Sequence, residues 1–266
     1  MKKLLQIIGE ILLIGLLTLL TQIGGIVYLF NIWVCKKVKW DNKWKPLLTF
    51  LILYCIGTFV LTPFLAPLFG REPVQHSERI QPANYMTILL NRNYVRPAIN
   101  ELLKSIDQKL SHTSIPINYL DANFPFINHF PLLPHLSHHD GKKLDLSLIY
   151  EDKKGMISKW QKSNSGYGVF VMPQKSESNQ IRKCLKEGYL QYDYPKYLTF
   201  GTKNKALKFS KKGTKKLIQA ILSEKQLEKI FIEPHLRERL NLKNKKIRYH
   251  GCRAVRHDDH IHLQIY

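Results

Sequence analysis

Two long stretches near the start of the chain contain no charged residue, and they limit the folds available to it. The first covers residues 11–34 and the second covers residues 46–70 of a 266-residue sequence. At a rise of about 1.5 Å per residue, each stretch is long enough to cross a bilayer as a helix. Pro63 and Pro67 should end or kink the second helix. The sequence therefore predicts two transmembrane helices, over about 11–34 and 46–66.

A secretory signal peptide is the alternative interpretation of the first stretch. The Met-Lys-Lys start is typical of such a peptide. However, the apolar stretch exceeds the usual length of about 7–15 residues, and no A-x-A-like cleavage site follows it. We therefore expect residues 1–70 to form a transmembrane hairpin.

The loop between the two stretches indicates how they would be oriented. Residues 35–45, CKKVKWDNKWK, contain five lysines and one aspartate, whereas the start of the chain has only Lys2 and Lys3. Short lysine-rich loops stay in the cytoplasm. We therefore expect a two-pass protein of the bacterial inner membrane. Both ends of the hairpin would lie outside, with everything after residue 70 in the periplasm or extracellular space.

The chain carries a formal net charge of +21, and most of this charge lies beyond residue 70. A strong positive field attracts polyanions in general. Outside a membrane these are anionic lipid headgroups and cell-wall polymers, so the expected topology argues against nucleic acid as a partner. A lysine-rich surface that only keeps the protein soluble is the alternative, and the sequence leaves both open.

The rest of the chain predicts one further domain with mixed secondary structure. Residues 71–84 are polar and indicate a linker, so the domain is expected over 85–266. Helices and strands mix without a βαβ rhythm, which favours an α+β fold with a small antiparallel sheet and flanking helices. Residues 151–200 show no clear pattern apart from a strand-like stretch at 168–172. The periodic stretches predict helices over 85–111 (interrupted at Pro97), 211–222 and 234–240, and strands over 144–150, 229–233, 248–255 and 260–266.

Histidine is concentrated in two short windows of the sequence. Four of the eleven histidines fall in residues 129–139 and four in residues 250–262. In the second window, His260 and His262 are two residues apart in an expected strand, so their imidazoles share one face. The alternating apolar residues point into the core. One strand therefore supplies both a hydrophobic anchor and a reactive face.

A carboxylate in the first window can complete a metal site. His138 and Asp145 are separated by six residues, and Gly141 can supply a tight turn between them. Two imidazoles and a carboxylate around an ion leave a fourth position for water, which is typical of a catalytic zinc site. Each pattern alone is most often an unremarkable surface feature, but together, each next to a strand, they favour a metal site.

The two windows resemble the signature segments of penicillin-insensitive murein endopeptidases. The matching stretches are SHHDGKKLD at 137–145 and HDDHIHLQI at 257–265, and KIFIEPHLRERL at 229–240 is similar to a segment between them. This family belongs to the zinc peptidase group of lysostaphin, D-alanyl-D-alanine peptidases and the hedgehog signalling domain. The resemblance implies an α+β domain around an antiparallel sheet, a bound zinc ion, and cleavage of peptide cross-links or stem peptides in peptidoglycan.

The resemblance also implies a role for each matching residue. His138, Asp145 and His262 match the three zinc ligands, and His260 matches the catalytic histidine beside the metal. The residues that match supporting parts of the active site are His135, His257, Asp258 and Asp259. The match lies mostly beyond residue 130.

Two positions depart from the family pattern. The family usually has a glutamine at the position of His139 and an acidic residue at the position of Lys143. Lys143 alternates in phase with Asp145, so it would put a cation near the site if the strand begins that early. These departures put the choice of substrate in doubt more than metal binding, because all three ligands are present.

Four cysteines are too few for a disulfide scaffold. Cys184 and Cys252 both lie in the expected outer domain, and an oxidising compartment permits a bridge between them. The sequence alone does not show whether their Cα atoms come close enough to form one.

The leading interpretation is a membrane-anchored zinc metallopeptidase that acts on peptidoglycan. Two alternatives stay open. One is a non-catalytic cell-wall-binding or scaffold protein with a degenerate site, and the other is a zinc phosphoesterase that uses the positive charge of the domain. Metal content and digestion of muropeptides distinguish the three.

Overall fold

The computed structural model describes residues 1–38, residue 42 and residues 44–266. Part of the expected basic loop 35–45, including Trp40, therefore lies outside the described residues. The chain divides into two compact units whose segments alternate along the sequence. Unit 1 comprises Met1–Val74, Met86–Pro97 and Asn123–Gly141, and unit 2 comprises Gln75–Tyr85, Ala98–Ala122 and Lys142–Tyr266.

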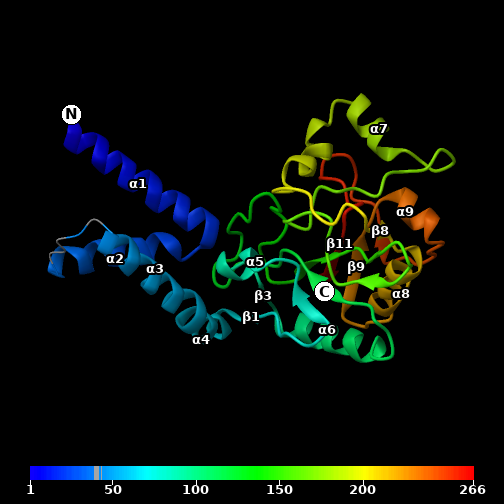
Figure 1. The fold of residues 1–266 in the computed structure, drawn as a ribbon, viewed down its shortest axis with the longest axis horizontal. Helices are drawn as coiled ribbons and strands as arrows, with labels where there is room; N and C mark the ends of the chain where they lie inside the picture. The colour runs from blue at the N-terminus through cyan, green and yellow to red at the C-terminus, as the bar shows by residue number, and fades with distance from the viewer. Residues whose placement is uncertain (39–41, 43) are drawn as a thin grey trace. The chain divides into compact units, whose positions relative to one another are not determined.

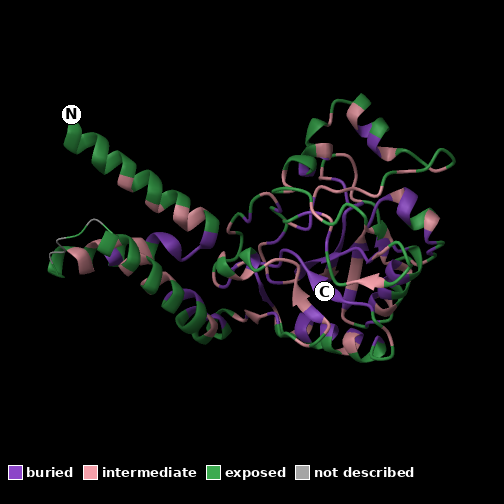
Figure 2. Cartoon of the chain, in the orientation of Figure 1, coloured by how far each residue is buried: buried purple, intermediate pink, exposed green. Residues whose placement is uncertain are grey.

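Unit 1 begins with apolar helices whose side chains are mostly exposed (Figures 1 and 2). Two helical stretches, Lys2–Thr21 and Trp44–Phe69, are long and apolar enough to cross a membrane by length and composition. The second includes a π-helical turn and a final 3-10 turn. The successive elements are α1 (Lys2–Thr21), α2 (Gly24–Val38), α3 (Trp44–Ile56), η1 (Gly57–Leu61), α4 (Thr62–Leu65) and η2 (Ala66–Phe69).

The expectation of one helix over 11–34 is wrong, because the chain reverses direction between α1 and α2. Gln22 adopts a left-handed conformation with φ of 66°, and α2 then packs back against α1. The glycine at position 25 permits this close approach, since a Cβ atom there would lie 1.9 Å from Thr18 Oγ1. Hydropathy alone does not reveal this turn, because the residues on both sides of it are apolar.

The turn between α1 and α2 is tied to later segments of unit 1. The side-chain oxygen of Gln22 accepts a hydrogen bond from the backbone N–H of Phe126 at 2.8 Å. Asn91 donates to Thr58 Oγ1 at 3.4 Å and to the carbonyl of Thr21 at 3.5 Å. The end of α1 and the start of α2 therefore lie beside Met86–Pro97 and Asn123–Gly141, whereas Lys2 lies at the other end of α1.

The later segments of unit 1 are short and held largely by side chains. Strand β1 (Glu72–Pro73) pairs with β3 (Tyr94–Val95), and α5 (Met86–Leu89) precedes β3. The buried guanidinium of Arg71 donates to the carbonyls of Phe124 and His139. This single side chain therefore links both ends of the Asn123–Gly141 segment to the end of the apolar helices.

Unit 2 contains a six-stranded sheet with the last strand near its centre. Strand β11 is antiparallel to both of its neighbours, β5 and β9, whereas the two outermost pairings are parallel. The expected antiparallel sheet is therefore present in its centre and differs at its edges. The strands, in order across the sheet, are β10 (Ile247–Arg248), β9 (Leu227–Phe231), β11 (His260–Ile265), β5 (Lys143–Ser147), β4 (Ile117–Tyr119) and β2 (Ile80–Pro82).

Helices and a small second sheet complete unit 2. In α8, Ser210 caps the first turn by accepting a hydrogen bond from the N–H of Gly213, and Leu217, Ile218 and Ile221 form its buried face. The helices are α6 (Pro97–Lys109), α7 (Gln180–Lys186), η3 (Leu190–Tyr197), α8 (Lys211–Leu222) and α9 (Pro234–Arg239). The second sheet has the order β7 (Ile157–Ser158), β6 (Tyr150–Glu151) and β8 (Lys208–Phe209).

Several elements differ from their sequence-based expectations. The expected strand 144–150 is divided, because β5 ends at Ser147 and Tyr150 begins β6 in the second sheet. The expected linker 71–84 supplies β1 and β2, and residues 168–172 form no strand. The helix 211–222 and the final strand, expected over 260–266 and present over His260–Ile265, follow the expectation closely.

Candidate metal centre

Asp145 and His262 face one another across the centre of the six-stranded sheet. The register of β5 and β11 places the two residues directly opposite, and the distance from His262 Nδ1 to Asp145 Oδ1 is 2.9 Å. Both side chains are buried. Two ligand atoms on one tetrahedral zinc, each at about 2.0–2.1 Å, are themselves about 3.3 Å apart. The pair is therefore close to the separation that a shared metal ion requires.

His260 lies on the same face of β11 and is enclosed by carboxylates. Its Nδ1 is 2.5 Å from Asp259 Oδ1, and its Nε2 is 3.7 Å from Asp145 Oδ2. Burial alone would lower the pKa of His260, but the negative charges of Asp145 and Asp259 outweigh it and raise this pKa to about 9. A cation bound by Asp145 would act in the opposite direction. His260 is therefore placed to hold or release a proton beside Asp145.

Tyr167 contributes to this site from residues 151–200, the segment in which the sequence shows no clear pattern. Its hydroxyl donates to Asp145 Oδ2 at 2.8 Å and accepts from the backbone N–H of Asp121 at 3.1 Å. Burial, together with the charges of Asp145 and Asp121, raises the pKa of Tyr167 well above 10. Tyr167 is therefore a permanent hydrogen-bond donor that fixes the orientation of the Asp145 carboxylate.

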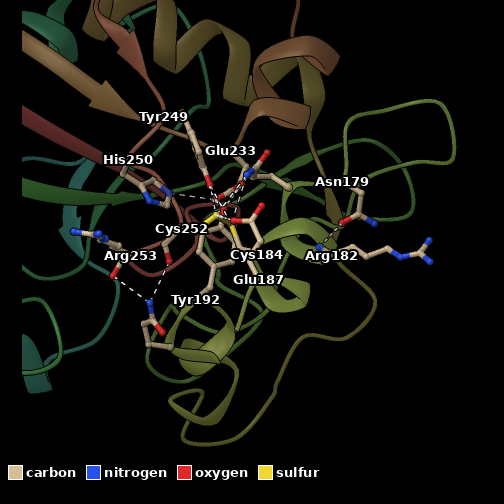
Figure 3. Close-up of a disulfide and its surroundings, with 12 residues drawn as sticks. Asn179, Arg182, Cys184, Glu187, Tyr192, Glu233, Tyr249, His250, Cys252 and Arg253 are labelled. Carbon is tan, nitrogen blue, oxygen red and sulfur yellow. Dashed lines mark hydrogen bonds and ion pairs between the residues drawn. A yellow bond between two sulfur atoms is a disulfide. The ribbon is translucent and has the colours of Figure 1, made fainter. Parts of the chain in front are cut away.

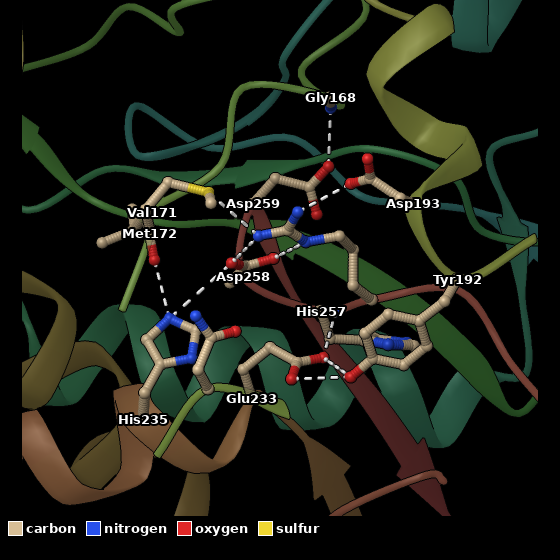
Figure 4. A network of polar contacts seen from close by, with 12 residues as sticks. Gly168, Val171, Met172, Tyr192, Asp193, Glu233, His235, His257, Asp258 and Asp259 are labelled. Carbon is tan, nitrogen blue, oxygen red and sulfur yellow. Dashed lines mark hydrogen bonds and ion pairs between the residues drawn. The ribbon is translucent and has the colours of Figure 1, made fainter. Parts of the chain in front are cut away.

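The same segment is fastened to the acidic pair before β11. Asp259 Oδ2 accepts from the N–H of Gly168 at 2.6 Å, and the carbonyl of Asp258 accepts from the N–H of Val171 at 2.8 Å (Figure 4). Gly168 has a φ of +80°, and a Cβ atom there would lie 2.4 Å from the carbonyl oxygen of Pro195. Only glycine fits this close approach. Gly168 therefore helps to hold the neighbouring Tyr167 in place.

Asp258 belongs to a buried network with Arg256 and His235. Arg256 donates from Nε and Nη2 to its carboxylate at 2.7 and 2.5 Å, and Arg256 also donates to Asp193 at 2.7 Å. Burial raises the pKa of Asp258 to about 7, against the opposing charge of Arg256. His235 Nε2 lies 3.6 Å from the same carboxylate and 2.7 Å from the carbonyl of Val171 (Figure 4). Asp258 therefore supports the loop that carries Tyr167.

His135 and His138 belong to unit 1. Their rings are 5.5 Å apart, and the N–H of His138 donates to the carbonyl of His135 at 2.9 Å. Both residues are buried. A single turn of the Asn123–Gly141 segment therefore carries both imidazoles, which the resemblance assigns to the active site.

Of the three expected ligands, Asp145 and His262 are in contact within unit 2, and His138 belongs to unit 1. A second group of described side chains, Glu233, His250 and His257, has the composition of a metal site.

The second group lies entirely in unit 2 and includes one residue that the sequence indicated, His257. Burial, followed by the positive charges that His250, His260 and His262 carry when protonated, lowers the pKa of His257 well below 6.5. A neutral imidazole is the form that binds a metal. Sequence reasoning missed Glu233 and His250, although Glu233 lies inside the KIFIEPHLRERL stretch.

The structure also shows where the other residues singled out in the sequence lie. Strand β5 begins at Lys143, so Lys143 is on the same side of the strand as Asp145, opposite Gln264. Cys184 and Cys252 form a disulfide, with their Cα atoms 5.3 Å apart (Figure 3). His139 lies in unit 1, where its carbonyl accepts from Arg71 at 3.1 Å.

Comparisons with known proteins add no assignment to this geometry: no family model matches the chain, and no curated protein matches it.

Proposed function

We propose that this chain is a membrane-anchored zinc peptidase that hydrolyses peptide cross-links or stem peptides of peptidoglycan. The observation that carries the proposal is the 2.9 Å approach of His262 to Asp145 on adjacent strands. The proposal takes His138 as the third ligand from the resemblance. An N₂O set of this kind fits zinc, because zinc accepts histidine and carboxylate and leaves a fourth position open in catalytic sites.

Each remaining residue of the centre has a role in this hydrolysis. With zinc held by His138, Asp145 and His262, a bound water would have a pKa of about 7 and the scissile carbonyl would be polarised. His260 would take a proton from the attacking water at Nε2 and return it to the leaving amine. Asp259 holds His260 through Nδ1, so that Nε2 faces Asp145. Tyr167 keeps the Asp145 carboxylate in its ligand orientation.

The anchor takes a different form from the expected two-pass hairpin. We infer that the turn at Gln22 lies on the outer side of the membrane, because Gln22 bonds to Phe126 in the segment that carries His135 and His138. The start of α1, with Lys2, then lies in the cytoplasm together with the basic end of α2. Lysine prefers the cytoplasmic side of a membrane, and this arrangement places both the start of α1 and the end of α2 there. At 15 residues, α2 extends about 22 Å and spans only part of the hydrocarbon core.

Digestion of purified sacculi by the full-length protein in detergent tests the proposal, with mass spectrometry of the released muropeptides. The wild type should release new peptide ends, and a chelator should abolish their release. His262→Ala should lose both activity and its bound zinc. His112→Ala, which changes an exposed histidine outside the site, is the matched control and should remain active.

Unchanged muropeptide release by His262→Ala would remove the basis of the proposal. Zinc binding by the wild type without any digestion would instead favour the non-catalytic cell-wall-binding protein. Hydrolysis of phosphodiesters in place of muropeptides would favour the phosphoesterase.

A further inference from the structure

Glu233, His250 and His257 converge at one edge of the six-stranded sheet, although they come from three different loops. Glu233 follows the end of β9 by two residues, and His250 follows the end of β10 by two residues. Because β9 and β10 are parallel, both strands end at the same edge. β11 is antiparallel to β9, so its first residues, preceded by His257, lie at that edge as well. The topology therefore delivers three side chains to one place.

The three side chains are close enough to share one ion. The candidate ligand atoms of the group all lie within 4.8 Å of one another. The ring centroids of His250 and His257 are 4.2 Å apart. His250 contacts Glu233 Oε1 through Nε2 at 3.2 Å, which leaves its Nδ1 for an ion. Two imidazoles and one carboxylate form a donor set that suits zinc and similar divalent transition metals.

Unpartnered nitrogen atoms in the group provide a second, independent indication of a ligand. Among the described residues, His250 Nδ1 and His257 Nδ1 are buried and have no hydrogen-bond partner. The side chain of His250 is 4% exposed, and His257 is 6% exposed as a residue. Buried polar atoms nearly always have a partner, so two orphaned imidazole nitrogens in one cluster call for an explanation. A metal ion that binds both rings provides it.

The surrounding residues hold the group in place. Tyr192 donates its hydroxyl to both carboxylate oxygens of Glu233 at 2.8 Å, and the backbone N–H of His257 donates to Glu233 Oε1 at 3.0 Å (Figure 4). The Cys184–Cys252 disulfide fixes the loop two residues beyond His250, and Tyr192 packs with Cys184 in a small core (Figure 3). Hydrogen bonds of this kind to a ligand carboxylate and a rigid loop are usual supports of a metal site.

We propose that Glu233, His250 and His257 bind a second divalent transition-metal ion, of the zinc class, separate from the ion at Asp145 and His262. The His257 ring lies 4.6 Å from the ring of His260, so the second ion is a neighbour of the catalytic histidine. Three protein ligands leave a fourth position for water or substrate. The proposal rests on its own residues and stands whether or not the protein is a peptidase.

The test is the metal content of the full-length protein in detergent, loaded with zinc, exchanged into metal-free buffer and measured by mass spectrometry of the metal. The wild type should hold two zinc ions per chain. Glu233→Gln and His250→Asn should each hold one ion fewer, and so should His262→Ala. The double variant Glu233→Gln with His262→Ala should hold none.

The matched control is His112→Asn, because His112 is an exposed histidine of unit 2 outside both proposed sites, and this variant should keep both ions. His250→Asn is the alternative if Glu233→Gln fails to fold, because His250 lies in a loop two residues after the end of β10. Far-ultraviolet circular dichroism and an intact disulfide identify the folded variants.

The outcomes separate this proposal from the proposed function. A wild type with one ion that His262→Ala loses and that Glu233→Gln and His250→Asn keep would overturn the second site and leave the first. One ion that is lost in Glu233→Gln and kept in His262→Ala would support the second site and contradict the first. A folded wild type that binds no zinc would overturn both.

Discussion

Tyr167 and Asp145 are joined by a buried 2.8 Å hydrogen bond, although one lies in an irregular loop and the other in a central strand. The loop therefore reaches the carboxylate that the proposed zinc ion needs. The orientation of Asp145 depends on a donor that no periodic pattern marks. This relationship provides the first of four predictions.

Tyr167→Phe should weaken zinc binding without unfolding the protein. The change removes the hydroxyl that holds Asp145 and keeps the ring, and the loss of such a supporting hydrogen bond typically costs about 10- to 100-fold in metal affinity. Competition with a chromogenic chelator measures the affinity. Tyr197→Phe, at an exposed tyrosine, is the matched control. Equal affinities for wild type and Tyr167→Phe would show that Tyr167 does not position Asp145.

Replacement of both Cys184 and Cys252 by serine should destabilise unit 2. The bridge closes a loop between residues 68 positions apart, for which chain entropy gives about 4 kcal/mol of stabilisation. Denaturant unfolding of the detergent-solubilised protein, followed by near-ultraviolet circular dichroism, measures the loss. The paired replacement of Cys35 and Cys55, which are free thiols, should leave the midpoint unchanged. Equal midpoints in the two double variants would contradict the expectation.

The ion pair between Glu177 and Arg239 should make stability depend on pH in the acid range. Hydrogen bonds from Arg239, at 2.8 and 2.5 Å, lower the pKa of Glu177 from 4.5 to about 2. A depressed carboxyl pKa stabilises the fold above pH 4.5, and this contribution disappears as the pH falls toward about 2.

Melting temperatures of the wild type and Glu177→Gln, compared across this range, test the prediction. The wild type should melt higher at pH 6, and the difference should shrink below pH 4.5. Arg239→Met should show the same pH dependence as Glu177→Gln, since either change removes the pair. A difference that grows as the pH falls would contradict the assignment.

Single cysteines should report opposite sides of the membrane for the two ends of the apolar region. In a background with Cys35 and Cys55 replaced by serine, an impermeant maleimide should label Lys153→Cys in intact cells. Lys3→Cys should react only after the membrane is permeabilised, because the proposed topology places the start of α1 in the cytoplasm. Labelling of both variants in intact cells would instead support a hairpin with both ends outside.

The sequence predicts those parts of the site that depend on local periodicity. His260 and His262 share a face because a strand alternates every two residues, and Ile261 and Leu263 are buried for the same reason. The pairing of the final strand with the strand of Asp145 also follows, because both strands carry proposed ligands that must meet. The helix 211–222 has a clear apolar face and a serine cap, so the sequence predicts where it begins and ends.

Features that depend on tertiary structure stay hidden in the sequence. Tyr167 lies in a loop whose path is set by Gly168 and by contacts with Asp258 and Asp259, so no pattern indicates it. Glu233 and His250 meet because β10 pairs with β9, and the strand expected over 248–255 covers only Ile247–Arg248, so His250 lies in the loop after it. The reversal at Gln22 is equally hidden, since residues on both sides of it are apolar.

The alternation of the two units along the chain has a consequence for how the protein matures. The helices of residues 1–38 are synthesised first, yet Gln22 in their turn bonds to Phe126, about one hundred residues later. The segment Asn123–Gly141 is therefore completed against helices that have already been made. A protein that lacks those helices loses the side-chain acceptor for the backbone of Phe126.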